Sequence, residues 1–191
     1  MRPEAPATLP LGEARTVFLR TNGLPEDGGY DARFFWLGVG PLKVPLPNLP
    51  ARVRAVRLHD LHHVLTGYNT SWRGETAIGA WELASGCGRY WAAWLLNFGA
   101  FAIGLFIAPR QLWAAFVRGR RSRNLYGLAT DAGVTDLPLG EVRAELGLTD
   151  RISKAGAADA LLFVLCGLVS LAATVLPYAV GLAVLVWLLR R

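Results

Sequence analysis

Residues 51–86, ARVRAVRLHDLHHVLTGYNTSWRGETAIGAWELASG, decide the fold of this chain. Val53, Val56 and His63 recur with their neighbours on one face, which predicts a helix over 51–65. Gly67 is typical of the residue that ends a helix. A second helix is expected to begin near Ser71–Gly74. Its Glu75 stands four residues after Ser71, which is not the spacing of a capping box, so this carboxylate is available for another role.

All three histidines of the chain lie between positions 59 and 63. On a helix, His59 and His63 are four residues apart and project from one face about one turn apart. This separation allows two imidazoles to bind one metal ion. Asp60 can reach the same ion or orient an imidazole from behind, and Glu75 faces the pair if the two helices pack antiparallel. His62 lies off this face and is interpreted as structural or surface-exposed.

The donor set of His59, Asp60, His63 and Glu75 contains nitrogen and oxygen ligands and no thiolate. It suits a divalent metal, and we favour Zn²⁺ over Fe²⁺ or Mn²⁺; positions remain open for water or substrate. The same spacing also occurs on polar helix faces near solvent, so spacing alone leaves both interpretations open.

Other histidine-based classes fail on residue supply. Phosphohydrolases of the His-Asp type need a further upstream histidine, and membrane di-iron enzymes need many more than three. Zinc proteases need Glu directly after the first histidine, where this chain has Asp60. The chain also lacks the glycine-rich motifs that bind nucleotide cofactors, so no organic cofactor is expected.

Two long apolar segments predict contact with a membrane. The chain is 53% hydrophobic with a mean hydropathy of +0.33. Trp91–Ala108 is uncharged and either spans a bilayer or packs against other helices. Ala160–Leu189 is also uncharged, and as one straight helix it would reach about 45 Å, against about 30 Å for a bilayer core. Since Pro177 divides this run, we expect a hairpin with both ends on the cytoplasmic side; two short tilted helices or one kinked span are the rivals.

The net charge of +6 fits either nucleic acid or an anionic membrane. The tightest basic cluster, Arg118, Arg120, Arg121 and Arg123, follows an apolar stretch, and no nucleic-acid-binding motif is present. We therefore predict a membrane partner and no nucleic acid. The two cysteines, Cys87 and Cys166, are too few for a disulfide framework and are expected to be free thiols.

These patterns predict an all-α protein with a metal site between two helices and a C-terminal hydrophobic helical hairpin. The expected divisions are a flexible tail over 1–12, a helical domain over 13–150 and a membrane-anchoring segment over 158–191. Glycine and proline at short intervals predict loops and short helical turns over 13–52. Further helices are expected after Pro109 and within 137–148. Five tryptophans either line a pocket for a polyprenyl tail or pack in the core: Trp72, Trp81, Trp91, Trp94 and Trp113.

HDLHHVLTGYNTSWRGE, residues 59–75, resembles the His-Asp-x-x-His-x11-Glu signature of the coenzyme Q biosynthesis protein 4 family. The similarity extends to GETAIGAWELASG, to FVRGRRSRNLYG and to LPLGEVRAELGL, and covers roughly residues 13–150. The apolar run Ala160–Leu189 has no counterpart in the usual members of that family.

The resemblance implies a helical protein of ubiquinone biosynthesis with His59, Asp60, His63 and Glu75 as metal ligands and catalytic residues. It implies a lyase activity, the oxidative decarboxylation at C1 of a polyprenylated hydroxybenzoate. A non-catalytic scaffold that binds a prenyl lipid and organises the quinone-biosynthetic enzymes is the alternative. The expected partners are a prenylated quinone precursor or other isoprenoid lipid, further enzymes of the pathway, and copies of the same chain in a homo-oligomer. The expected place is the cytoplasmic face of a bacterial inner membrane.

Overall fold

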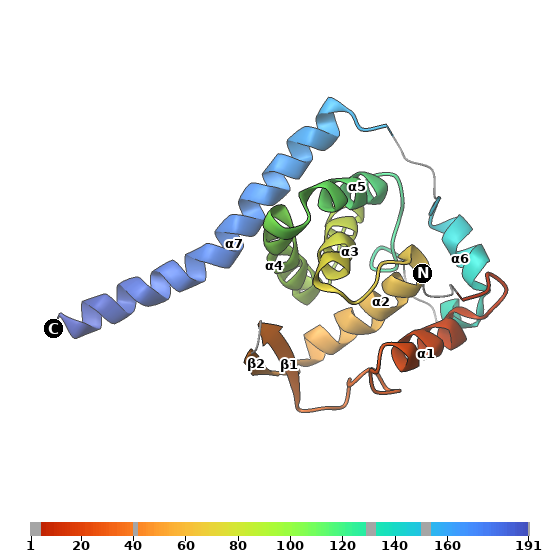
Figure 1. Ribbon diagram of the computed structural model, residues 1–191, viewed down its shortest axis with the longest axis horizontal. Helices are drawn as coiled ribbons and strands as arrows, with labels where there is room; N and C mark the ends of the chain where they lie inside the picture. The colour runs from red at the N-terminus through yellow and green to blue at the C-terminus, as the bar shows by residue number, and fades with distance from the viewer. Residues whose placement is uncertain (1–4, 40–41, 129–132, 150–153, 191) are drawn as a thin grey trace.

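The computed structural model describes residues 5–39, 42–128, 133–149 and 154–190. The predicted all-α class is confirmed, with one small β-hairpin added (Figure 1). In chain order the elements are α1 Leu11–Thr21, β1 Phe34–Val39, β2 Leu42–Pro47, α2 Pro50–Thr66, α3 Trp72–Ser85, α4 Trp91–Ile107, α5 Pro109–Gly119, the 3₁₀ turn η1 Val134–Asp136, α6 Leu139–Glu145 and α7 Ala157–Leu189.

The two helices predicted around the histidines are α2 and α3, and local chemistry sets their ends. Pro50 opens α2 at a position where its missing N–H costs nothing. Gly67 ends α2 in the left-handed region with a φ of 78°, as its position predicts. Ser71 caps α3 by accepting a hydrogen bond from the Gly74 amide. A side chain at Gly74 would collide with the Asn69 carbonyl oxygen, so glycine is required where the loop meets α3.

The core of the domain lies where α3, α4 and α5 pack together. Trp81 of α3, Phe101 of α4 and Phe116 of α5 are its largest fully buried side chains. Ala108 and Pro109 separate α4 from α5, because proline starts a helix readily and disfavours the helical conformation at the residue before it, here Ala108 with a φ of −153°. This packing carries α3 as a rigid support for the carboxylates that face α2.

The prediction of loops and short turns over 13–52 is wrong for much of that segment. Residues from Leu11 onward form α1, whose Leu11 and Leu19 are buried. The hairpin of β1 and β2 follows, antiparallel, with Phe34 opposite Pro47 and Trp36 opposite Pro45. Proline has no N–H group, and an edge strand tolerates it where that group would point away from the partner strand. A proline-rich segment can therefore still pair in this hairpin.

The N-terminal residues are tied to α6. The Leu11 amide donates to the Leu137 carbonyl, and the Leu139 amide donates to the Leu9 carbonyl. Helix α1 therefore begins inside the segment that the sequence predicts as a tail over 1–12. Residues 1–4 of that segment lie outside the described residues.

The C-terminal hairpin prediction is wrong, because α7 is one continuous helix with Pro177 inside it. At 1.5 Å per residue its 33 residues reach about 50 Å. Its outer half projects away from the domain and the helix bends along its length (Figure 1). Proline removes one backbone hydrogen bond and bends a helix without ending it when the rest of the helix is strongly apolar. Within α7, the segment Ala157–Pro177 is long and apolar enough to cross a membrane, by length and composition.

The first half of α7 is fixed to the domain. Phe163 contacts three aromatic rings, those of Phe101, Trp113 and Phe116, with centroids 5.1–5.4 Å apart. At the start of the helix, Arg121 donates two hydrogen bonds to the Asp159 carboxylate. The packing and the ion pair together set the direction in which α7 leaves the domain.

Candidate metal centre

Three side chains from α2 and α3 converge on one point. His59 Nε2 lies 3.1 Å from His63 Nε2 and 3.3 Å from one oxygen of Glu75. The other Glu75 oxygen lies 3.4 Å from His63 Nε2. The structure thus brings together three of the four predicted ligands, and these groups are suited to hold a metal ion. In a tetrahedral zinc site with ligands at about 2.05 Å, two donor atoms stand about 3.3 Å apart, which matches these spacings.

The contact made by Nδ1 of His63 shows which nitrogen of this ring carries the proton. His63 Nδ1 lies 2.9 Å from the Tyr68 carbonyl oxygen, which can only accept a hydrogen bond. The proton of the neutral ring is therefore on Nδ1, and Nε2 presents a lone pair toward His59. Phe18 stacks on the His63 ring at 5.2 Å and limits its rotation.

His59 is oriented in the same way by a carboxylate that the sequence analysis did not single out. Its Nδ1 lies 2.9 Å from Oε1 of Glu82, which is fully buried in α3. Glu82 accepts the Nδ1 proton and leaves the Nε2 lone pair directed at His63 and Glu75. A carboxylate behind a histidine ligand is a common second layer of metal sites, where it fixes the ring and raises its basicity.

The Nε2 lone pairs of His59 and His63 therefore face the Glu75 carboxylate. All three groups are hydrogen-bond acceptors, and none of them offers a hydrogen to the others. Such a group of acceptors is stable only with a positive charge at its centre, either a proton or a metal cation. Glu75 is about a third exposed, whereas His63 is nearly buried, so water or a ligand can reach the centre from the Glu75 side. The arrangement fits an ion with two nitrogen ligands, one carboxylate and open positions.

The pKa values of the metal-free site show the same demand for positive charge. Burial lowers the pKa of His59, but Glu82 and Glu75 more than offset it, so the pKa lies well above its ordinary value. Burial acts to raise the pKa of Glu75, but hydrogen bonds from His59 and His63 lower it to about 2. The site thus keeps its carboxylate ionised and retains a proton on imidazole until a cation replaces it.

Asp60, the fourth predicted ligand, points elsewhere. Its carboxylate accepts a 2.5 Å hydrogen bond from the Tyr30 hydroxyl, which comes from the segment between α1 and β1. The carboxylate is buried, and burial raises its pKa although the Tyr30 hydrogen bond acts against this. Asp60 could bind the same ion only by giving up Tyr30. In the present arrangement it ties the N-terminal segment to α2 beside the two histidines.

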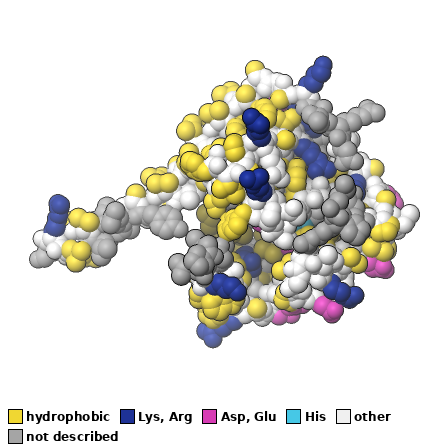
Figure 2. All heavy atoms as spheres, in the orientation of Figure 1, with side chains coloured by type: hydrophobic (Ala, Val, Ile, Leu, Met, Phe, Trp, Pro, Cys, Tyr) yellow, Lys and Arg dark blue, Asp and Glu magenta, His cyan; other side chains and the backbone are white. Residues whose placement is uncertain are grey.

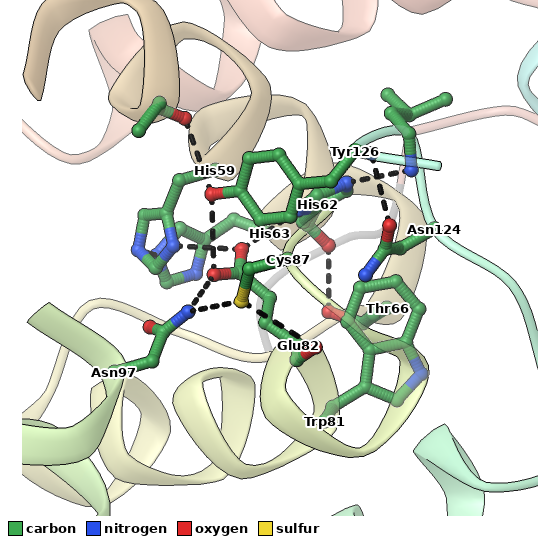
Figure 3. A network of polar contacts seen from close by, with 12 residues as sticks. His59, His62, His63, Thr66, Trp81, Glu82, Cys87, Asn97, Asn124 and Tyr126 are labelled. Carbon is green, nitrogen blue, oxygen red and sulfur yellow. Dashed lines mark hydrogen bonds and ion pairs between the residues drawn. The ribbon is translucent and has the colours of Figure 1, made fainter. Parts of the chain in front are cut away.

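Glu82 is the centre of a buried polar network (Figure 3). Its Oε1 accepts from both His59 and His62, and its Oε2 accepts from Asn97 of α4 at 2.6 Å and from the Tyr126 hydroxyl at 3.2 Å. Four donors compensate the burial of the carboxylate, and the pKa of Glu82 lies well below its ordinary value. The network links α2, α3 and α4 at the level of His59.

His62 is fully buried, so of the two predicted interpretations the structural one holds and the surface-exposed one is wrong. Its Nε2 accepts from the Leu125 amide, and its Nδ1 donates to Glu82 at 2.7 Å. Because both ring nitrogens are used inside the fold, His62 has no lone pair left for an ion. Burial lowers its pKa, which keeps the ring neutral.

Two sequence signals point to this network. Glu82 follows Glu75 by seven residues, two helical turns, so both carboxylates lie on one face of α3. Asn97 is the single polar side chain within Trp91–Ile107. A lone carboxylate and a lone amide in apolar helices need buried partners, because an uncompensated buried polar group is costly.

A cavity of about 140 Å³ lies beside His63, with neither His59 nor Glu75 in its lining. His63 forms part of its wall, together with Phe18 of α1 and Tyr68 of the loop before α3. The five tryptophans do not share such a pocket: Trp81 is in the core, whereas Trp72 and Trp91 are exposed. Trp94 packs on Phe98, and Trp113 on Phe163.

Comparison of the chain with protein-family models, with curated proteins and with solved structures found no match in any of the three.

Proposed function

We propose that this chain is a membrane-attached, metal-dependent protein of ubiquinone biosynthesis that decarboxylates a polyprenylated hydroxybenzoate at C1. The observation that carries the metal-dependent part is the meeting of the two Nε2 lone pairs of His59 and His63 with the Glu75 carboxylate. The pathway is supported by the resemblance of residues 59–75 to the coenzyme Q biosynthesis protein 4 signature.

The proposed chemistry removes a carboxylate from an electron-rich aromatic ring. The bond between C1 and the carboxyl carbon breaks and CO₂ leaves. The electron pair of the broken bond stays on C1. In simple decarboxylation C1 then takes a proton. In the oxidative form C1 gains a hydroxyl group from water, and molecular oxygen takes up the two electrons and leaves as hydrogen peroxide. When bound, the divalent metal supplies positive charge that offsets the carboxylate and the electron-rich ring.

The chain's own residues hold the metal-binding groups in position. Glu82 and the Tyr68 carbonyl hold the two imidazoles with their lone pairs inward, so little reorganisation is needed when the ion binds. The adjoining cavity of about 140 Å³ is the size that holds one benzene-sized group, since an engineered cavity of about 150 Å³ binds benzene. A substrate ring placed there would lie against His63, and its carboxylate would have to extend past that imidazole to reach the open side of the centre at Glu75.

The metal part is tested on the purified full chain by elemental analysis. We expect one zinc per chain, lost in His63→Ala and in Glu75→Ala but kept in Glu26→Ala, which changes an exposed carboxylate. Equal zinc content in all four proteins would contradict the site.

The catalytic part is tested by adding a prenylated hydroxybenzoate to the metal-loaded protein. We expect CO₂ release and a product lighter by the carboxyl group or with hydroxyl in its place, abolished by Glu75→Ala. Bound zinc and bound lipid with no turnover, aerobically or anaerobically, would refute the enzyme and favour the scaffold function.

For the membrane, we propose that α7 crosses a bacterial inner membrane once, with the domain on the cytoplasmic face. Ser170 is the last fully buried residue of α7 among those described. The 19 residues from 171 to 189 carry no charge and reach about 28 Å, close to the 30 Å of a bilayer core. Two cations, Arg151 and Lys154, precede this span within twenty residues and two, Arg190 and Arg191, follow it, so positive charge flanks both ends. We place the domain on the cytoplasmic face because it also carries the basic cluster of Arg118, Arg120, Arg121 and Arg123.

The topology is tested with a reporter fused after Arg191 that is active only outside the cytoplasm. We expect activity with the full helix and none when residues 171–189 are deleted. If a second reporter, which is active only inside the cytoplasm, is active at the same position, the proposed single crossing with a cytoplasmic domain is refuted.

A further inference from the structure

The exposed face of the β-hairpin has the composition of a buried one. In an antiparallel pair, side chains alternate between two faces, and a solvent-facing side is expected to be polar. Phe34 and Trp36 share one face, and their cross-strand partners Pro47 and Pro45 share it with them. All four are exposed, Trp36 by 64% and Phe34 by 45%.

The opposite face of the hairpin already has a partner. Phe35 lies on that face, and the guanidinium of Arg52 in α2 stacks on its ring at 3.5 Å. Leu46, directly opposite Phe35, is half-buried. The inner face is thus covered in part, through Phe35 and Leu46, although its Val44 is 42% exposed. The outer face is a second apolar surface, on which both aromatic rings are exposed.

Cations frame this outer face. Lys43 lies on it and is exposed, and the exposed Arg33 holds its guanidinium 5.5 Å from the Phe34 ring. Figure 2 shows hydrophobic side chains beside Lys and Arg at the lower left, where Figure 1 places the hairpin. Aromatic rings next to Lys and Arg are typical of the interface between a membrane core and anionic head groups.

The hairpin also lies on the side where α7 leaves the domain. In Figure 1, which looks down the shortest axis of the molecule, the hairpin lies below α4 at the lower left of the helical domain, and the projecting half of α7 extends to the left. A bilayer that takes up the outer half of α7 would therefore pass close to the hairpin. This argument rests on the proposed single crossing of α7.

We propose that the outer face of β1–β2 is a second membrane contact, which places Phe34 and Trp36 in the interfacial layer of an anionic bilayer. Lys43 and Arg33 contact lipid phosphates, and the rings enter to the depth of about 5–10 Å usual for interfacial segments. Helix α7 fixes the domain to the membrane at one point, and the hairpin fixes its rotation about that point. The surface that bears the hairpin then faces lipid permanently.

The test places a fluorescent probe on the hairpin of the full chain in vesicles. Trp36→Cys is labelled with an environment-sensitive dye in a Cys166→Ala background, since Cys87 is fully buried. Val17→Cys is the matched control, an exposed apolar position on α1. The vesicles contain phosphatidylcholine and phosphatidylglycerol, with and without brominated acyl chains.

We expect the dye at position 36 to shift to the blue and to be quenched by brominated lipid severalfold more than the dye at position 17. Adding Arg33→Glu and Lys43→Glu should remove most of that difference. Equal quenching at the two positions, in protein that still floats with the vesicles, would overturn the hairpin contact and leave the α7 crossing intact. Protein that does not float would refute the crossing instead.

Discussion

The substitution Glu82→Gln tests whether the buried carboxylate sets the metal centre. Glutamine keeps the shape of the side chain but has one acceptor oxygen and one NH₂ group. Each Glu82 oxygen now accepts from two donors, His59 and His62 on one side and Asn97 and Tyr126 on the other. Turned toward the histidines, its NH₂ meets two N–H donors. Turned the other way, it strands the Asn97 amide alone, because the Tyr126 hydroxyl can donate to the Ala55 carbonyl oxygen at 3.2 Å and accept from the new NH₂.

The expected magnitudes follow from this count. Each buried donor left without a partner costs about 1–3 kcal/mol, so the variant, with the amide turned toward Asn97, should be less stable by about 1–3 kcal/mol. A lost carboxylate behind a histidine ligand typically weakens metal binding about tenfold to hundredfold. We therefore expect zinc affinity to fall by that factor, which corresponds to about 1.4–2.7 kcal/mol.

The assay is competition for zinc with a chromophoric chelator, at several pH values, on protein shown to be folded by circular dichroism. Glu13→Gln, an exposed carboxylate on α1, is the control. Zinc binding requires a deprotonated His59, and Glu82 raises the pKa of that imidazole. The variant should thus be weaker at high pH but reach its full affinity at a lower pH than the parent protein. A folded Glu82→Gln with unchanged affinity and pH dependence would refute the role of Glu82 in orienting His59.

Three further outcomes are expected. In the parent protein, zinc affinity should fall as the pH drops through the raised pKa of His59, with proton release on binding measured by calorimetry in buffers of different ionisation enthalpy; no proton release near neutral pH would contradict the raised pKa of His59. Tyr30→Phe should destabilise the protein by about 1–3 kcal/mol in urea, because buried Asp60 loses its hydroxyl donor; an unchanged midpoint would show that water replaces the hydroxyl. Phe163→Ala should cost about 3 kcal/mol and speed proteolysis after Lys154, because three aromatic rings lose their contact with α7; unchanged cleavage would show that Arg121 and Asp159 alone hold the helix.

Helical periodicity and turn residues predicted α2 and α3 well, because the information is local. Gly67 ends one helix and Ser71 starts the next where the sequence places them. The approach of His59, His63 and Glu75 also follows from local geometry, since four residues make one turn and a short loop reverses the chain.

The second layer of the site depends on tertiary packing, which periodicity does not contain. Glu82 meets Asn97 and Tyr126 across distances of 15 and 44 residues along the chain. Asp60 was expected beside the metal because it adjoins His59, yet neighbouring residues on a helix point about 100° apart. Its carboxylate found Tyr30 from an unpredicted part of the chain.

The apolar composition of the C-terminal region predicted helix correctly, but the predicted turn at Pro177 is wrong. Pro177 was weighed as a break because proline costs about 3 kcal/mol inside a helix. A turn at that point would leave several backbone groups without partners in an apolar surrounding, at several kcal/mol each. Continuing the helix loses only one hydrogen bond, so α7 stays continuous through its proline.

Helix α4 joins the candidate metal centre to α7, and its one polar residue explains how. On one side Asn97 donates to Glu82, which holds His59; on another side Phe101 packs on Phe163 of α7. A helix that only crossed or touched lipid would gain nothing from a buried amide, and a simple core helix would not expose Phe106 by 77%. Helix α4 thus contacts Glu82 through its polar face and α7 through an apolar face. It therefore couples the position of α7 to the position of His59.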